Sequence, residues 1–465
     1  MGAGRESAAG PGAAAARHTG YQGREGAGPR VTRSSGSPVS PIAPVASERL
    51  LIRPSGPLRG TAVVNGAKNA ALPIMAACLL TDEPSIIERV PHVTDVVTMI
   101  EILRQLGVSV SFADGRLSVA PGRYTGTAAP YDLVSRMRAS VCVLGPLLTR
   151  QGKAQVSMPG GCVIGPRPID LHLKGLQALG AAFTIEHGYV VGTASGLRGG
   201  RVQLGGAFGS SVLATANVMM AATLAEGVTT IEQAACEPEV VDLAHCLIGM
   251  GARIEGQGGP VIRVEGVSRL RGAHHRIIPD RIESGTLMIA AAMVGGDLTL
   301  EGARAEHLGA VIDKLAEAEV VIEKLDSALR VRAAHPPRAV EITTLPFPGF
   351  PTDLQAQMMA LMAVGRGVSV LTEKVYPERF MHIGELNRMG AAITREGSSA
   401  IVKGVERLSG APVNGSDLRA SAALLLAGMC AENQTELTGV EHLKRGYQNL
   451  EEQLVRLGAD IQRIS

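Results

Sequence analysis

The 465-residue sequence contains no tryptophan, and its other aromatic residues are few, with six tyrosines and six phenylalanines. Proteins that bind single-stranded nucleic acid stack bases on aromatic side chains. The 45 lysines and arginines are balanced by 43 aspartates and glutamates, giving a formal charge of +2. Binding to a nucleic-acid backbone needs a clear excess of basic residues. We therefore expect no nucleic-acid partner.

Long apolar runs and paired cysteines are also missing. No run of about 18 apolar residues occurs, so we expect no membrane-spanning helix. No Cys-x-x-Cys pair and no cysteine framework is present, which is typical of a reducing compartment such as the cytoplasm. Ligand spacing for a metal is absent as well, so we expect no metal site. The six cysteines are Cys78, Cys142, Cys162, Cys236, Cys246 and Cys430.

Residues 1–47 differ in composition from the remainder of the chain. They are rich in Gly, Ala, Ser and Pro and contain five arginines against two glutamates, without an apolar core for a secretory signal. Three interpretations remain open: a disordered tail, an over-long translational start, or an organelle transit peptide. We expect a cytoplasmic protein, with organelle targeting by this segment still open.

From Glu48 onward the chain repeats with a period of about 70 residues. In each repeat a helix ends at a glycine, and a β-like run follows, which predicts a glycine in the left-handed region after the helix. A second marker, an apolar helix end followed by a polar turn and a strand, also occurs six times. Units of this size are too long for a solenoid, so we expect six α/β units. The glycines are Gly107, Gly180, Gly251, Gly390 and Gly458, and Glu319 occupies the sixth position.

Two segments contain candidate chemistry in the first half of the chain. Lys68 and Asn69 follow a glycine-led turn before an apolar helix, where a lysine can bind an anion or remain solvated. The segment MPGGCVIGPRPIDLH places Cys162 among glycines, with Arg167 five residues later. A polar, arginine-flanked loop can lower the pKa of a thiol, so Cys162 is a candidate for acid–base or covalent chemistry. Cys78, Cys142 and Cys430 lie in apolar helices, so we expect them to be structural.

Arginines and one aspartate mark the remaining candidate positions. Arg138, Arg379, Arg419 and Arg445 each lie beside turn residues. Together such arginines suit a substrate that carries phosphate and carboxylate groups, although a single one is typical of a surface ion pair. Asp353 follows a proline-rich turn, where it is either a helix N-cap or a general base.

These segments together resemble the enolpyruvyl transferase family. The similarity runs from about Glu48 to the C-terminus and is specific, because many strings match at once. The matching strings are GAKNAALPI, YDLVSRMRAS, PGGCVIGPRPIDLH, AATLAEG, EPEVVD, PDRIESGT, FPTDLQAQ, ERFMH, SDLRAS and RGY.

The resemblance implies an α/β fold of the inside-out αβ barrel type, with six repeated units in two domains. It implies one domain made of residues 48–67 and 279–465, and a second made of residues 68–278, with the active site in the cleft between them. The implied reaction transfers the enolpyruvyl group of phosphoenolpyruvate to the 3-hydroxyl of UDP-N-acetylglucosamine and releases phosphate, as a step of peptidoglycan precursor synthesis. No metal or organic cofactor is implied.

The resemblance also assigns roles to residues of this chain. Cys162 is implied as proton donor, covalent partner and fosfomycin target, and Asp353 as the base, while Lys68 and Arg445 stabilise the phosphate. The phosphoenolpyruvate site also includes Arg167, and the amino sugar contacts Asn69 and Asp353. The other implied substrate-binding residues are Arg138, Pro168, Ile169, Asp170, Leu171, His172, Ser210, Ser211, Val212, Val375, Arg379 and Arg419.

Four positions depart from the family pattern. Gly209 replaces a lysine and Leu213 a glycine in the stretch that cradles the nucleotide diphosphate, while Lys444 replaces an aspartate and Cys236 an arginine. A lost cation weakens a dianion site. Two other hypotheses therefore stay open beside the UDP-sugar: a paralogue that transfers enolpyruvyl to the 3′-hydroxyl of UMP, as in nucleoside antibiotic pathways, and a non-catalytic nucleotide-binding paralogue. No protein partner can be inferred.

Overall fold

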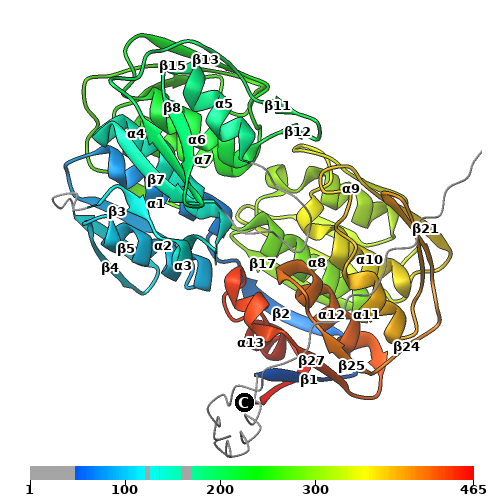
Figure 1. Ribbon diagram of the computed structural model, residues 1–465. Coiled ribbons are helices and arrows are strands. Elements are labelled where there is room, and N and C mark those ends of the chain that lie inside the picture. The colour runs from blue at the N-terminus through cyan, green and yellow to red at the C-terminus, as the bar shows by residue number, and fades with distance from the viewer. Residues whose placement is uncertain (1–47, 121–125, 136, 159–168, 465) are drawn as a thin grey trace, which may run out of the picture. The chain divides into compact units, whose positions relative to one another are not determined.

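Four-stranded sheets with adjacent helices make up most of the chain in the computed structural model (Figure 1). The structure describes residues 48–464, without residues 121–125, 136 and 159–168. The interpretations of residues 1–47 and the roles of Cys162, Arg167 and Pro168 therefore lie outside the described residues. The part of the chain from residue 46 onward forms one compact unit.

Within the described ranges, six four-stranded sheets share one topology. In each, an edge strand pairs in parallel with a second strand, and two antiparallel pairings follow. The three sheets of the first half are β16 (His274–Arg276), β3 (Ser85–Glu88), β5 (Arg116–Ala120) and β4 (Ser109–Ala113); β6 (Ala128–Ala129), β7 (Lys153–Ser157), β9 (Tyr189–Thr193) and β8 (Ala182–Glu186); and β10 (Arg201–Gln203), β13 (Val228–Glu232), β15 (Val261–Glu265) and β14 (Arg253–Glu255).

The other three sheets follow the same order. They are β2 (Leu58–Val63), β17 (Gly296–Glu301), β19 (Ala328–Ala333) and β18 (Val321–Lys324); β20 (Ile342–Thr344), β21 (Val368–Glu373), β23 (Ser399–Lys403) and β22 (Ala392–Glu396); and β25 (Pro412–Asn414), β27 (Thr435–Thr438), β1 (Arg49–Arg53) and β28 (Asp460–Ile464). Two small sheets pair β11 (Gly205–Gly206) with β12 (Gly209–Ser210) and β24 (Leu408–Ser409) with β26 (Ala431–Glu432). The counted sixfold repeat and the mixed α/β class are therefore confirmed.

One helix of each unit is apolar along most of its length, and it is largely buried, as expected for a helix without a polar face. These helices are α1 (Lys68–Ala77), α4 (Leu144–Gln151), α6 (Val212–Ala222), α8 (Arg281–Val294), α10 (Gln355–Ala363) and α12 (Leu418–Cys430). Helices α8, α10 and α12 pack on one another and lie together in Figure 1. Helices therefore fill the interior and sheets surround them, which is the inside-out arrangement.

A second helix of each unit is only partly buried. These helices are α2 (Thr94–Gln105), α5 (Asp170–Ala178), α7 (Pro238–Gly249), α9 (Gly309–Glu317), α11 (His382–Arg388) and α13 (Leu450–Arg456). The short helical segments are α3 (Tyr131–Val134) and the 3₁₀ turns η1 (Cys78–Leu80), η2 (Arg138–Val143), η3 (Ala305–His307), η4 (Thr352–Leu354) and η5 (Val440–Arg445). No helix of the described ranges is long and apolar enough to cross a membrane.

The repeat glycines adopt the backbone conformation that the sequence predicts. All five lie directly after the C-cap residue of a helix and have φ between 87° and 109°. Glu319 occupies the same position in the sixth unit and also has positive φ, at 70°. A side chain is disfavoured in this region because Cβ approaches the backbone. Tertiary packing therefore imposes the turn on Glu319 despite its local cost.

Buried apolar side chains form two large clusters. One runs from Ala67 to Ile278. The other combines Leu50–Val64 with Ile282–Ala459. We call them the first and the second core, and we propose that they correspond to the two domains implied by the family resemblance.

The chain passes between the two cores at a pair of adjacent segments. Gly66 and Pro279 form an antiparallel bridge there, and Ala67 N donates to Ile278 O at 2.8 Å. A Cβ on Gly66 would lie 1.7 Å from Arg89 O, so only glycine fits this crossing. The candidate site begins immediately after it, at Lys68.

Candidate active site

Lys68 and Arg445 are joined by one carboxylate. Lys68 is the first residue of α1, and its Nζ lies 3.1 Å from Oδ2 of Asp95 in the first turn of α2. Arg445, the last residue of η5, places Nε 3.1 Å from the other oxygen of Asp95. The Asp95 side chain is only 5% exposed. We call these three residues the Lys68 cluster; it brings together two predicted site residues from segments assigned to different cores.

A second carboxylate with two cations lies around Asp353. Its oxygens contact Nη1 of Arg379 at 2.8 Å and Nη2 of Arg419 at 3.1 Å. Burial raises the pKa of Asp353, but Arg419 and Arg379 more than offset this, and the pKa lies well below its usual range. We call these residues the Asp353 cluster. It unites three predicted residues and holds Asp353 ionised.

Asp280 lies between the two clusters. It is the N-cap of α8, where its Oδ1 accepts from Ile282 N at 2.8 Å and Glu283 N at 3.1 Å. Its other oxygen accepts from the backbone N of Lys68 at 3.3 Å. Burial raises the pKa of Asp280, and the positive charge of Arg419 opposes that rise. Asp280 thus connects the start of α1 electrostatically with the Asp353 cluster.

Glu283 lies one helical turn further along α8 and is buried. Its carboxylate accepts from Asn65 Nδ2 at 2.9 Å and from Asn65 N at 3.3 Å. Burial, followed by repulsion from Asp280, raises the pKa of Glu283 to about 8. Glu283 is therefore protonated at neutral pH in the folded protein.

Glu373 shapes the loop that carries Val375 and Arg379. This fully buried carboxylate accepts from Thr344 Oγ1 at 2.6 Å, Thr352 Oγ1 at 2.9 Å and Val375 N at 2.8 Å. Thr352 in turn accepts from Arg379 Nη1 at 3.0 Å. The network fixes the Arg379 side chain beside Asp353 and places Val375 at the start of the same loop.

Four implied substrate-binding residues, Ile169 to His172, form a separate group around the start of α5. His172 is buried, and its Nδ1 lies 3.0 Å from Asn217 Nδ2 on α6. Burial and, secondarily, the charge of Arg138 lower the pKa of His172 to about 3, so the imidazole is neutral. Ile169 is buried as well, Leu171 is partly buried, and Asp170 is exposed.

The hairpin β11–β12 lies against this group. A Cβ on Gly206 would lie 3.1 Å from Leu171 Cδ1, and a Cβ on Gly209 would lie 2.9 Å from Pro346 Cγ in the second core. Ser210 ends the hairpin, Ser211 caps α6 by accepting from Ala214 N at 3.3 Å, and Val212 opens that helix. The close approach to Pro346 is possible because position 209 has no side chain and a φ of 100°.

One predicted residue remains to be placed. Asn69 follows Lys68 in α1 and is half-buried. The described parts of the chain therefore gather the predicted residues into the Lys68 cluster, the Asp353 cluster and the group around α5. Cys162, Arg167 and Pro168 lie outside those parts.

Two of the departures from the family pattern have a physical reading in the structure. The Lys444 amino group pairs with Glu48 at the start of β1, whose pKa it lowers. Lys444 therefore forms its ion pair with Glu48, while Arg445 forms an ion pair with Asp95. Cys236 donates weakly to Ala234 O at 3.7 Å, and burial followed by Glu237 raises its pKa.

The cysteines expected to be structural are held in the thiol form. Burial raises the pKa of Cys78, Cys142 and Cys430 to about 12. Such thiols are inert as nucleophiles at neutral pH. Among the described residues, no group of three or more His, Cys, Asp and Glu side chains is arranged to hold a metal ion.

Sequence reasoning missed Asp95, Asp280, Glu283 and Glu373. Asp280 and Glu283 lie within the string PDRIESGT, and an aspartate three residues before a glutamate at a helix start is a capping signal that could have identified Asp280. Asp95 has no such signal, because its partner Arg445 lies 350 positions away along the chain.

Comparison with known proteins shows the family to which the chain belongs. The model of EPSP synthase (3-phosphoshikimate 1-carboxyvinyltransferase) matches residues 52–454. A UDP-N-acetylglucosamine 1-carboxyvinyltransferase of Granulibacter bethesdensis is 53% identical over 421 residues, which cover 90% of this chain and 100% of the relative. The chain belongs to the UDP-N-acetylglucosamine 1-carboxyvinyltransferase family. It is therefore an enolpyruvyl transferase.

Further relatives carry the same name. The enzymes of Rhodospirillum centenum and Methylacidiphilum infernorum are each 52% identical, covering 90% of this chain and 99% of each relative. Among solved structures, the enolpyruvyl transferase NikO from Streptomyces tendae has a TM-score of 0.81 at 26% identity and covers 90% of this chain and 99% of its own. An EPSP synthase from Acinetobacter baumannii shares the fold, with a TM-score of 0.71 at 19% identity, covering 90% of this chain and 100% of its own.

Proposed function

We propose that this chain transfers the enolpyruvyl group of phosphoenolpyruvate to the 3-hydroxyl of UDP-N-acetylglucosamine and releases phosphate. The observation that carries this proposal is the convergence of Lys68 and Arg445 on Asp95. Two cations from distant parts of the chain gather there around a single carboxylate. Such a pair of cations can bind a ligand that carries both a phosphate and a carboxylate group.

The chemistry requires an acid and a base. The acceptor 3-hydroxyl oxygen forms a bond to C2 of phosphoenolpyruvate and loses its proton, while C3 gains a proton, giving a tetrahedral ketal. The bond from C2 to the phosphate oxygen then breaks as C3 loses a proton, and the enolpyruvyl ether and inorganic phosphate leave. Both protons must be moved by positioned groups.

Lys68 and Arg445 serve the phosphate in this scheme. Asp95 contacts both cations and balances one of their two positive charges. The arriving phosphate competes with Asp95 for them, and the same cations then stabilise the charge that grows on the leaving group. Arg167 joins them according to the family resemblance.

Asp353 serves as the base and Cys162 as the proton donor. The two arginines keep Asp353 ionised, so it is ready to accept a proton at neutral pH. Its basicity is low while both arginines contact it. The acceptor must therefore draw at least one guanidinium group away from Asp353. In our proposal the amino sugar of the nucleotide does so, because it binds Arg379 and Arg419.

The identity of the acceptor rests on the relatives. Three relatives named UDP-N-acetylglucosamine 1-carboxyvinyltransferase are 52–53% identical to this chain. This favours the UDP-sugar over UMP and over a non-catalytic role. The group around His172 and the hairpin β11–β12 would contact the nucleotide. Peptidoglycan precursor synthesis in the cytoplasm is the pathway that we propose for the product.

The test measures phosphate release from phosphoenolpyruvate with UDP-N-acetylglucosamine, with UMP and without nucleotide. We expect phosphate release only in the mixture that contains UDP-N-acetylglucosamine. Turnover only with UMP would replace the acceptor, and no release with either nucleotide would support a binding protein.

A second test examines Cys162 directly. We expect the variant Cys162→Asp to retain turnover and to lose inactivation by fosfomycin, because a carboxylic acid donates a proton but is not alkylated as a thiolate is. A Cys162→Asp protein that fosfomycin still inactivates would show that another group reacts with the drug.

A further inference from the structure

The two arginines of the Asp353 cluster are held by different second partners. Arg379 makes a second hydrogen bond, since its Nη1 also donates to Thr352 Oγ1 at 3.0 Å. The Arg419 guanidinium instead lies over the ring of Tyr447, 5.1 Å from the ring centroid. An aromatic face attracts a cation, and the attraction is stronger when water is excluded. Tyr447 is 3% exposed and the Arg419 side chain 4%, so this contact is shielded from solvent.

The hydroxyl group of Tyr447 is bound in a defined direction. It lies 2.8 Å from Thr286 Oγ1, which donates its own hydrogen to Ile282 O at 2.8 Å. A threonine hydroxyl has one hydrogen, so Tyr447 is the donor in its bond with Thr286. Gln357 Nε2 in turn donates to the Tyr447 hydroxyl at 3.1 Å. The phenol therefore donates to α8 and accepts from α10, which fixes the orientation of the ring beside Arg419.

Gln357 also connects this network to the base. Its Nε2 lies 3.1 Å from the backbone oxygen of Asp353, and a carbonyl oxygen only accepts, so the amide nitrogen faces the start of α10. Burial raises the pKa of Tyr447, and the charge of Arg419 opposes that rise, so the phenol keeps its proton at neutral pH. The ring therefore meets Arg419 as a neutral π face and not as a counter-charge.

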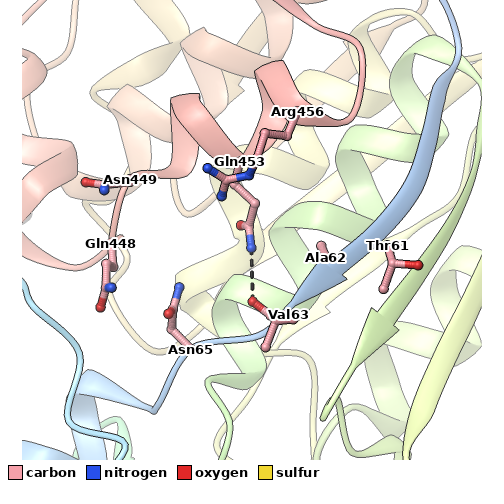
Figure 2. A pocket seen from close by; sticks show the side chains of 8 residues that line it. All are labelled: Thr61, Ala62, Val63, Asn65, Gln448, Asn449, Gln453 and Arg456. Carbon is pink, nitrogen blue, oxygen red and sulfur yellow. Dashed lines mark hydrogen bonds between the residues drawn. The ribbon is translucent and has the colours of Figure 1, made fainter. Parts of the chain in front are cut away.

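The chain that follows Tyr447 is anchored on two sides. Gln448 accepts from His92 N at 2.7 Å, and Gln453 Nε2 donates to Val63 O at 3.0 Å. Figure 2 shows both glutamines at the wall of one polar pocket, with the bond to Val63 as a dashed line. The ring of Tyr447 is thus held through its hydroxyl group and through the adjacent chain.

We propose that Tyr447 is a positioning residue for enolpyruvyl transfer, whose ring holds the Arg419 guanidinium against Asp353 so that it meets the acceptor in one orientation. A long arginine side chain has many rotamers, and the ring favours one of them. Without the ring, Arg419 stays in the site but is poorly oriented. The effect on turnover rests on the proposed function, whereas the contact between the ring and Arg419 does not.

Two substitutions separate the ring from the hydroxyl group. Tyr447→Phe keeps the ring, and Tyr447→Leu replaces it with an aliphatic side chain. We expect kcat for phosphate release to stay within about threefold of wild type in Tyr447→Phe and to fall about tenfold in Tyr447→Leu. KM for phosphoenolpyruvate should change by less than about threefold in both variants, because the Lys68 cluster is intact.

Val331→Ala is the control for lost stability. Val331 is a fully buried residue of β19 in the same core, so its truncation leaves a cavity without touching the Asp353 cluster. We expect this variant to be less stable than wild type and to keep wild-type kcat. A tenfold loss of kcat in Val331→Ala as well would show that reduced stability alone explains Tyr447→Leu.

A double-mutant cycle tests whether Tyr447 acts through Arg419. In the Arg419→Met background the ring has no guanidinium to hold, so adding Tyr447→Leu should lower kcat by less than about threefold. Urea unfolding of the same four proteins should give losses of stability that are less than additive. Equal losses of kcat in Tyr447→Phe and Tyr447→Leu, wild-type kcat in Tyr447→Leu, or additive effects in the cycle would each overturn the proposal.

The two readouts also separate this inference from the proposed function. Wild-type phosphate release with an additive cycle would overturn the role of Tyr447 and leave the function standing. If no nucleotide supports phosphate release by the wild-type protein, the proposed function fails and the positioning role fails with it. The unfolding cycle then still decides whether the ring holds Arg419.

Discussion

The Lys68 cluster and the Asp353 cluster have the same composition, one carboxylate between two cations, but they differ in placement. The Lys68 cluster joins segments of different cores, and Arg445 is 38% exposed in it. The Asp353 cluster belongs to the second core alone, and its arginines are only 4% and 7% exposed. The first arrangement can therefore exchange its carboxylate for a ligand, whereas in the second, buried arrangement Asp353 must lose a guanidinium contact before it can act as the base.

The strongest test of this difference removes the charge of Asp353. In Asp353→Asn two buried guanidinium groups lose their counter-charge, and the base is lost. We expect turnover to fall by about two orders of magnitude or more. We also expect the free energy of unfolding to fall by about 3 kcal/mol. Steady-state phosphate release and urea unfolding measure the two effects.

The matched control for that variant is Asp297→Asn. Asp297 makes two hydrogen bonds to Arg330, but both side chains are 41% exposed, so solvent replaces the lost interaction. Near-normal turnover and stability are expected. Wild-type turnover in Asp353→Asn would contradict the role of Asp353 as base.

The raised pKa of Glu283 predicts how the free energy of unfolding depends on pH. Its pKa is about 8 in the folded protein and near 4.5 in the unfolded chain, so the unfolded chain loses the proton first as pH rises. This group therefore reduces stability progressively from about pH 4.5 to about pH 8. Glu283→Gln should remove that loss and be more stable than wild type at pH 8, on the order of 3 kcal/mol.

Melting temperatures of both proteins at pH 5 and pH 8 provide the check. The gap between variant and wild type should widen at the higher pH. A constant gap would show that Glu283 is already ionised in the folded protein at pH 5.

Asp95→Asn tests the exchangeable character of the Lys68 cluster. Without the competing carboxylate, Lys68 and Arg445 are free to bind an anion, so inorganic phosphate should bind roughly tenfold more tightly, a gain of about 1.4 kcal/mol. The gain should shrink as salt screens the charges. Equilibrium competition at two ionic strengths measures it. Weaker phosphate binding would show that Asp95 positions the cations instead of competing for them.

The smallest expected effect extends the comparison to the two cores themselves. The three units of the first core all have glycine after the helix, whereas one unit of the second core has Glu319 at φ 70°. Glu319→Gly should relieve this strain and stabilise the protein by about 0.5–1 kcal/mol. The exposed pair with Arg366 contributes little against this. Chemical unfolding measures the free energy of unfolding of this variant and of Gly390→Ala. The first value should rise and the second should fall relative to the wild-type protein.

The sequence predicts repeating features better than it predicts single contacts. The glycine spacing predicts six units because each helix-to-strand turn needs the same positive φ, and the structure has that turn even at Glu319. Arg379, Arg419 and Asp353 are recognisable because each lies beside turn residues. Asp95 is an ordinary helical aspartate in sequence, and only the folded chain brings it to Arg445. Asn65 is likewise unmarked, since its contact with Glu283 depends on the packing of segments 218 positions apart.

The pairing of β1 with β27 and β28 has a consequence for synthesis on the ribosome. The Arg49 side chain forms an ion pair with Glu436, 387 positions later, so β1 is made long before its partner strands. Its fully buried residues Leu50 and Ile52 stay without their native neighbours during most of translation. The segment from Ala67 to Ile278 has all of its strands before then. Chaperone demand during translation should therefore concentrate on this early apolar strand, and release of the finished chain completes the last sheet.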